Sequence, residues 1–89
     1  MNCQDYIIRD NNKLIEFASE MESKNESRTY LNKVYIHLLW MQPGHNINIA
    51  ESVKAENIER FIKCVCLFIY ERPDYNIQFS NEYDKVIRK

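Results

Sequence analysis

The clearest pattern of apolar and polar positions in this chain lies between residues 58 and 70. At the angular step of a helix, about 100° per residue, the apolar side chains fall on one broad arc and charged side chains lie opposite. The apolar set is Ile58, Phe61, Ile62, Val65, Phe68 and Ile69. Pro73 ends the pattern, because the residue before a proline is disfavoured in a helix. The pattern predicts a helix over 53–71, capped by Ser52, with Phe61, Ile62, Val65 and Ile69 buried.

A strand is the competing interpretation of the second half of this segment. The run from Cys64 to Tyr70 is continuously apolar and rich in residues that favour strands, and period alone does not assign such short runs. The apolar pattern as a whole is longer than an ordinary strand. Its length therefore favours the helix.

Helical spacing of apolar residues predicts two further helices, over 11–23 and 28–41. Asp10, Asn11 or Asn12 is placed to cap the first. The polar segment 23–27 is predicted to connect them, with Ser27 as the cap of the second. Pro43 and Gly44 end the second helix. A hairpin strand over 33–41 that turns at Pro43-Gly44 is the alternative.

Two short segments alternate polar and apolar residues and predict strands near 46–50 and 75–79. Because they flank the central helix, they could pair in parallel as a βαβ unit. At the C-terminus, Tyr83, Val86 and Ile87 are spaced i, i+3 and i+4, which predicts a short helix within 80–89. The predicted fold class is α+β and mainly helical, in a single domain over 1–89.

The order of these elements also supports an alternative, winged-helix-like fold. A helix, the Pro43-Gly44 turn, a short strand, a helix and a possible β-hairpin follow one another, and this order resembles that of a winged helix. The resemblance implies DNA binding, but the predicted 53–71 helix mixes acidic and basic residues where a recognition helix is basic and polar. Positive charge is in excess only near 28–33 and 85–89. The candidate nucleic-acid contacts are Arg28, Lys33, Lys85, Arg88 and Lys89.

Composition narrows the class of protein. The 89 residues are 45% hydrophobic, enough for one packed domain, and the net charge of −1 gives no general attraction to nucleic acid or anionic membranes. No apolar run is long enough to span a bilayer, and the N-terminus lacks the pattern of a signal peptide. We therefore expect a cytoplasmic protein that does not bind membranes. Frequent Ile, Asn, Lys and Tyr with one Gly indicate AT-rich codons, as in some bacteria, phages and mobile elements.

The sequence contains no motif for catalysis or cofactor binding. A single glycine excludes a glycine-rich phosphate loop. The three cysteines are an odd number and do not suggest a disulfide framework. On a helix, Cys64 and Cys66 point about 200° apart, so a zinc site that includes His37 and His45 is the less favoured reading. We expect free, buried thiols, no cofactor, no metal and no enzymatic activity.

Two apolar strips lie outside the main helical faces and are candidates for a protein interface. Leu67 and Tyr70 fall on the charged side of the central helix, and Ile36 and Trp40 lie off the main face of the second helix. Exposed apolar strips often mark interaction sites, and Trp and Tyr are frequent interface anchors. The alternative is that other parts of the chain cover them. We expect a small non-catalytic protein-binding module: a homodimer, or an inhibitor, immunity or adaptor protein. A DNA-binding regulator of a mobile element is the alternative.

Overall fold

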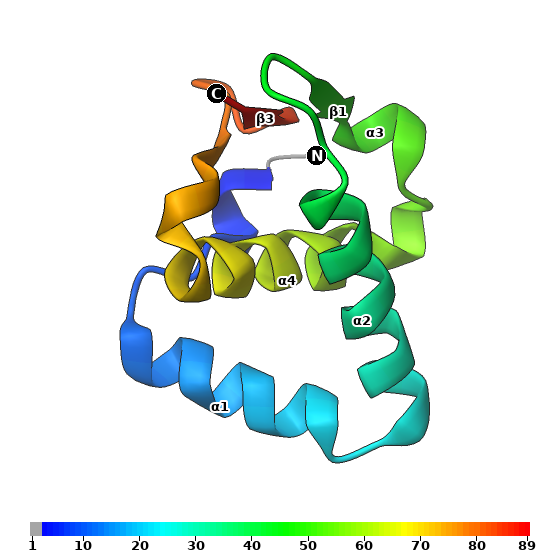
Figure 1. Ribbon diagram of the computed structural model, residues 1–89. Helices are drawn as coiled ribbons and strands as arrows, with labels where there is room; N and C mark the ends of the chain where they lie inside the picture. Colours follow the sequence, from blue (N-terminus) through cyan, green and yellow to red (C-terminus); the bar gives the residue numbers. More distant parts are fainter. Residues whose placement is uncertain (1–2) are drawn as a thin grey trace.

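Helix α4 (Ile58–Glu71) crosses the centre of the molecule in the computed structural model, which describes residues 3–89 (Figure 1). Helices α1 (Asn11–Glu22) and α2 (Asn25–Leu39) pack against α4 and against each other. The short 3-10 helix η1 (Cys3–Tyr6) packs against α4 on the side that faces the sheet. The α+β, mainly helical fold predicted from the sequence is therefore confirmed.

The packing of α1, α2 and η1 against α4 explains why this helix is apolar over more than one face. Its buried residues are Ile58, Phe61, Ile62, Cys64, Val65, Cys66, Leu67 and Phe68. The predicted burial of Phe61, Ile62 and Val65 is confirmed, whereas Ile69 is only partly buried. Leu14, Leu38, Ile49 and Val86 join the same core from the other elements. The α-carbon radius of gyration is 12.2 Å, close to the value of about 12 Å expected for a compact chain of this length.

The first two helices differ from prediction mainly at the start of α2. Helix α1 begins where expected, and the Asp10 carboxylate caps it by accepting from the Asn12 backbone N–H at 2.8 Å. Helix α2 begins at Asn25, so Ser27 is not its cap; Lys24 occupies that position without a side-chain bond. A contact between Glu26 and Arg60 on α4 supports this additional turn. The hairpin alternative for 33–41 is wrong, since residues 33–39 are helical.

The central helix starts later than predicted. Residues Ile49–Ser52 form a separate one-turn helix, α3, capped by Asn48, whose side chain accepts from the Glu51 N–H at 3.2 Å. Val53 and Lys54 are extended, and the 3-10 helix η2 (Ala55–Asn57) leads into α4. Ser52 is therefore not the cap of α4. The break between α3 and α4 lies between Ile49 and Ile58, and both residues are buried in the core.

The strands form a three-stranded antiparallel sheet. Strands β1 (Asn46–Asn48) and β2 (Ile77–Phe79) each pair with β3 (Lys85–Arg88), in the order β1-β3-β2. Both predicted strands are thus present but shorter, and a 3-10 helix, η3 (Pro73–Tyr75), precedes β2. The parallel βαβ arrangement was wrong, because β1 and β2 do not pair with each other.

The predicted C-terminal helix was also wrong, because residues 85–88 form β3. Val86 and Ile87 are β-branched and favour strands, and an isolated helix this short is marginal. The Ser80 hydroxyl donates to Asp84 Oδ1 at 2.7 Å and accepts from the Lys85 N–H at 3.1 Å, which closes the β2-β3 hairpin. From α2 onward the chain runs helix, strand, short helix α3, helix and hairpin, so α3 and the 3-10 helices are additions to the order of the winged-helix-like alternative.

No helix within residues 3–89 has the length and apolar character needed to cross a membrane.

Candidate protein-binding surface

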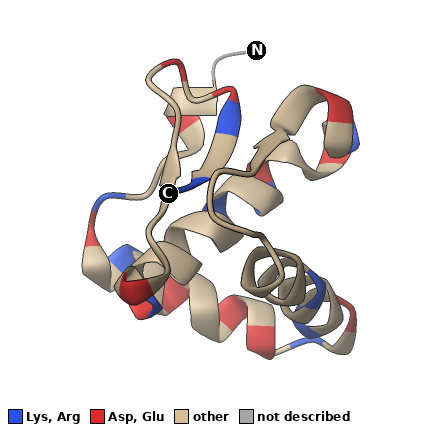
Figure 2. Ribbon diagram, turned by 45° about the horizontal axis from the view of Figure 1, so that its top comes forward, with Lys and Arg blue, Asp and Glu red and all other residues tan. Residues whose placement is uncertain are grey.

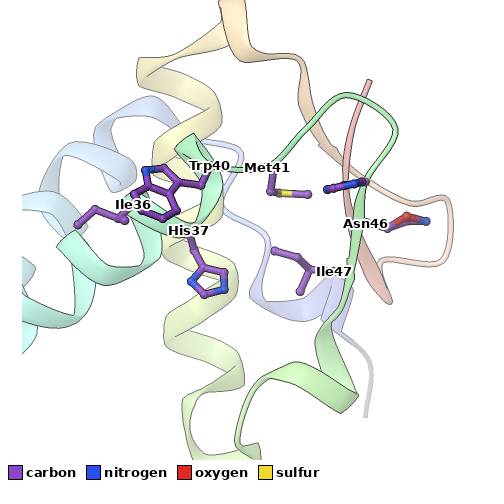
Figure 3. A pocket seen from close by; sticks show the side chains of 7 residues that line it. Ile36, His37, Trp40, Met41, Asn46 and Ile47 are labelled. Carbon is purple, nitrogen blue, oxygen red and sulfur yellow. The ribbon is translucent and has the colours of Figure 1, made fainter.

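The largest apolar side chain left in solvent is on α2. Leu31, Val34 and Leu38 of this helix point into the core, whereas Trp40 at its C-terminal end is 79% exposed and Ile36 is 52% exposed. The two are one helical turn apart, and Figure 3 shows them side by side on the same side of α2. Both belong to the interface predicted from the sequence.

A depression lies between this end of α2 and strand β1. It is lined by Ile36, His37, Trp40, Met41, His45, Asn46 and Ile47. Met41 is buried and Ile47 is partly buried, and their side chains point toward each other in Figure 3. The depression therefore has an apolar floor, with Trp40 and Ile36 at its rim.

A second depression continues along α2 toward α3 and the start of α4. Its lining comprises Tyr30, Lys33, Val34, His37, Ile47, Ser52, Val53, Lys54, Asn57 and Phe61. It shares His37 and Ile47 with the first depression. We refer to the two depressions together as the α2–β1 groove.

Arg60 fixes the Tyr30 end of the groove. Its guanidinium binds both carboxylate oxygens of Glu26 at 3.0 Å and donates to Asn57 Oδ1 at 3.0 Å. It also stacks over the Tyr30 ring, 3.9 Å from the ring centre, a favourable cation–π geometry. Burial raises the pKa of Tyr30, so its phenol stays neutral near pH 7. These contacts join the first turns of α2 and α4.

Aromatic packing fixes the middle of α2. Tyr35 meets Phe68 of α4 edge-to-face, with ring centres 5.0 Å apart, and Phe68 meets Tyr75 in the same way at 5.7 Å. The Tyr35 hydroxyl donates to the Glu71 carboxylate at the end of α4. Burial, and then this hydrogen bond, raise the pKa of Tyr35. One wall of the groove is therefore held to the central helix along its length.

The connection from α2 to β1 is tied to the sheet. Pro43 and Gly44 (φ +88°) are the central residues of a turn closed by the His45 N–H and the Gln42 carbonyl at 3.0 Å. Proline followed by a glycine with positive φ is typical of a type II turn. Gly44 therefore reverses the chain after Trp40 rather than ending the helix directly. The Arg88 side chain of β3 donates to the Met41 carbonyl.

The predicted interface does not form one surface. Leu67 is only 3% exposed and belongs to the hydrophobic core, so its assignment to an exposed interface was wrong. Tyr70 is 44% exposed but lies in a different depression, with Ile7, Ile8 and Phe79. Only Ile36 and Trp40 are brought together.

The candidate nucleic-acid contacts are also scattered. Arg28 lies near the start of α2, the end away from the sheet, and donates to Asn25 Oδ1 at 2.6 Å. Lys85 and Arg88 lie on β3, and Lys89 follows directly after it. The guanidinium carbon of Arg88 lies over the Tyr75 ring, 4.8 Å from the ring centre. Lys33 alone of the five lines the groove. Acidic and basic residues are interspersed over the molecule (Figure 2).

The cysteines are free thiols, and Cys64 and Cys66 are buried. Burial raises the pKa of Cys64 to about 12 and also raises the pKa of Cys66. Such thiols stay protonated near pH 7 and are poor nucleophiles and metal ligands. Among residues 3–89, no three His, Cys, Asp or Glu side chains are grouped as a metal site would require.

No protein-family model matches the chain, and neither a curated protein nor a solved structure matches it.

The groove residues that sequence reasoning did not assign to a site include Met41, Ile47 and Lys54. Met41 and Ile47 looked like ordinary core positions. The place of Ile47 beside the end of α2 depends on the pairing of β1 with β3, which the sequence did not reveal.

Proposed function

We propose that this protein is a non-catalytic protein-binding module whose contact surface is the α2–β1 groove. The observation that carries the proposal is the position of Trp40, which is 79% exposed at the rim of an apolar depression. Tryptophan is a frequent anchor at the centre of protein interfaces. The exposed Trp40 and Ile36 side chains lie at the edge of a depression that Met41 and Ile47 also line, and exposed apolar side chains of this kind often mark an interaction site.

The rigidity of the walls supports binding without large rearrangement. Contacts from Arg60, Tyr35 and Arg88 fix α2 and the following turn to α4 and the sheet. A surface fixed before binding loses less conformational entropy when a partner docks. The groove would therefore act as a preformed site.

Strand β1 gives the partner a second means of attachment. It is an edge strand, because the sheet order is β1-β3-β2. An edge strand presents backbone N–H and C=O groups that can pair with an extended segment of another chain. A partner strand on β1 would place alternate side chains beside the apolar floor of the groove.

Affinity capture with matched variants tests the proposal. Immobilised wild-type protein should retain a stoichiometric partner from a lysate of the source organism, and Trp40→Glu and Ile36→Glu should lose it. Ile15→Glu is the control, since Ile15 is 53% exposed on α1, away from the groove. Circular dichroism must show that all variants are folded. If Ile15→Glu abolished capture and Trp40→Glu did not, the assigned surface would be wrong.

A DNA-binding regulator is the second candidate, because, apart from the short helix α3 and the 3-10 helices, the element order from α2 onward is that of the winged-helix-like alternative. The hairpin loop at 80–84 carries Glu82 and Asp84, which would repel a phosphate backbone. The exposed residues of α4 are mixed in charge, with Lys63 paired to Glu59 at 2.8 Å. Salt-dependent retention on heparin and on duplex DNA would favour this candidate; elution at low salt favours protein binding.

A further inference from the structure

We propose that the occupant of the α2–β1 groove is an acidic segment of a different protein, with an apolar side chain that docks beside Trp40. This inference rests on the proposed function and specifies the chemistry of the partner. It follows from the charges along the groove, from their effect on self-association, and from the length of the groove.

The charged and titratable lining of the groove is basic. Lys33 and Lys54 lie on its two walls, and His37 and His45 line its apolar half. No Asp or Glu among the described residues lines either depression. This local imbalance differs from the chain as a whole, which has a net charge of −1.

The acidic group of a neighbouring depression does not reverse this imbalance. Glu26 lines a neighbouring depression that shares Tyr30 and Lys33 with the groove. Both of its carboxylate oxygens are bound by Arg60 at 3.0 Å, so its charge is offset. Carboxylates of a partner would therefore meet Lys33 and Lys54 without a competing anion in the groove.

The same charges argue against a second copy of this chain as the occupant. A symmetric dimer joins the same patch of both subunits. It would bring the two lysines of one groove toward those of the other, and like charges brought together oppose association. Single-stranded nucleic acid is also less suited, because a channel for it carries a series of cations for successive phosphates, and this groove carries two lysines.

The length of the groove sets the size of the segment. Tyr30 and Trp40 mark its ends on α2, and ten residues of helix rise about 15 Å. An extended chain covers that distance in about five residues. The docked segment is thus a short acidic peptide with its apolar residue at the Trp40 end and its carboxylates toward Lys33 and Lys54.

Peptide display with charge-reversed variants provides the test. A random dodecapeptide library is selected on the immobilised protein, and an enriched peptide is synthesised and titrated by fluorescence. Trp40 is the single tryptophan of the chain, so its emission reports occupancy of the groove directly. The variants are Lys33→Glu with Lys54→Glu, and, as a matched control, Lys13→Glu with Lys24→Glu, two exposed lysines outside the groove.

The expected result is enrichment of acidic peptides with an aromatic or aliphatic residue and a blue shift of Trp40 emission on binding. Reversal of Lys33 and Lys54 should weaken binding at least tenfold, and the control pair should change it less than twofold. Enrichment of neutral or basic peptides, absence of enrichment, or an unchanged affinity in the Lys33/Lys54 variant would overturn the inference. A Trp40 shift produced by a labelled single-stranded oligonucleotide, or a concentration-dependent dimer broken by Trp40→Glu, would also overturn it.

These outcomes separate the inference from the proposed function. If Trp40→Glu removes binding and charge reversal does not, the groove is the binding surface and the acidic partner is wrong. Because the Trp40→Glu variant lacks the reporter tryptophan, its peptide binding is measured by isothermal titration calorimetry. If binding survives Trp40→Glu, the groove itself is not the binding surface.

Discussion

Replacement of Leu67 by Ala is expected to destabilise the protein severely, although the sequence placed this residue among charged neighbours on α4. Leu67 is 3% exposed and belongs to the core. Removing three carbon groups costs about 2.4 kcal/mol in lost transfer free energy, and the remaining cavity raises the cost to about 3–4 kcal/mol. A domain of 89 residues has a total stability of roughly 4–13 kcal/mol, so the variant should be marginally folded.

Urea denaturation followed by circular dichroism measures this loss. With a urea m-value of about 1.5 kcal/mol/M, the midpoint should fall by about 2 M. Ile36→Ala is the control, because Ile36 is a member of the other apolar strip and is 52% exposed; its unfolding free energy should change by less than about 1 kcal/mol. If Leu67→Ala unfolded within about 0.5 kcal/mol of the wild type, the burial of Leu67 in the core would be wrong.

Three further perturbations test the structure elsewhere. Asp10→Ala should lower the unfolding free energy by about 1 kcal/mol through loss of the α1 cap, and Asp10→Asn should restore most of it in the same urea titration. Arg88→Ala should lower the thermal midpoint because it removes contacts to Met41 and Tyr75, and Lys89→Ala, which changes an exposed residue, should not. Because burial raises the pKa of Cys64 to about 12, its thiol should react with a thiol reagent at pH 8 only after denaturation. The unfolded thiol ionises near pH 8.5, so the contribution of Cys64 to the free energy of unfolding should be complete below that pH and should fall progressively above it. Reaction of native Cys64 at the rate of a model thiol would contradict its burial.

The elements with strong local patterns were predictable from the sequence. Helix α1, the body of α2 and the body of α4 follow from apolar spacing and caps, because each buries a face that its own sequence defines. The C-terminal tail after α4 shows the limit of prediction from apolar spacing alone. Tyr83, Val86 and Ile87 have helical spacing, yet the tail forms β3 because β1 and β2 both need an antiparallel partner.

The candidate surface was predictable only in part, for the same reason. Ile36 and Trp40 were identified from their position off the main face of α2, and they are exposed. Leu67 occupied an equivalent position on α4, but it is buried in the core, and η1, a segment distant in sequence, packs against α4. Lys54 and Ile47 reach the groove through the turn at Gly44 and the pairing of β1 with β3. Such long-range contacts decide which apolar strips remain exposed.

Amide chemical-shift mapping with the captured partner tests the central claim most directly. Isotope-labelled protein is titrated with the partner, and the shifted backbone amides are assigned. The account predicts that the largest shifts fall in residues 30–41, 45–47 and 52–57, with the Trp40 indole N–H among them. Shifts centred instead on Ile15 of α1, or on the depression around Tyr70, would contradict the assignment of the α2–β1 groove as the binding surface.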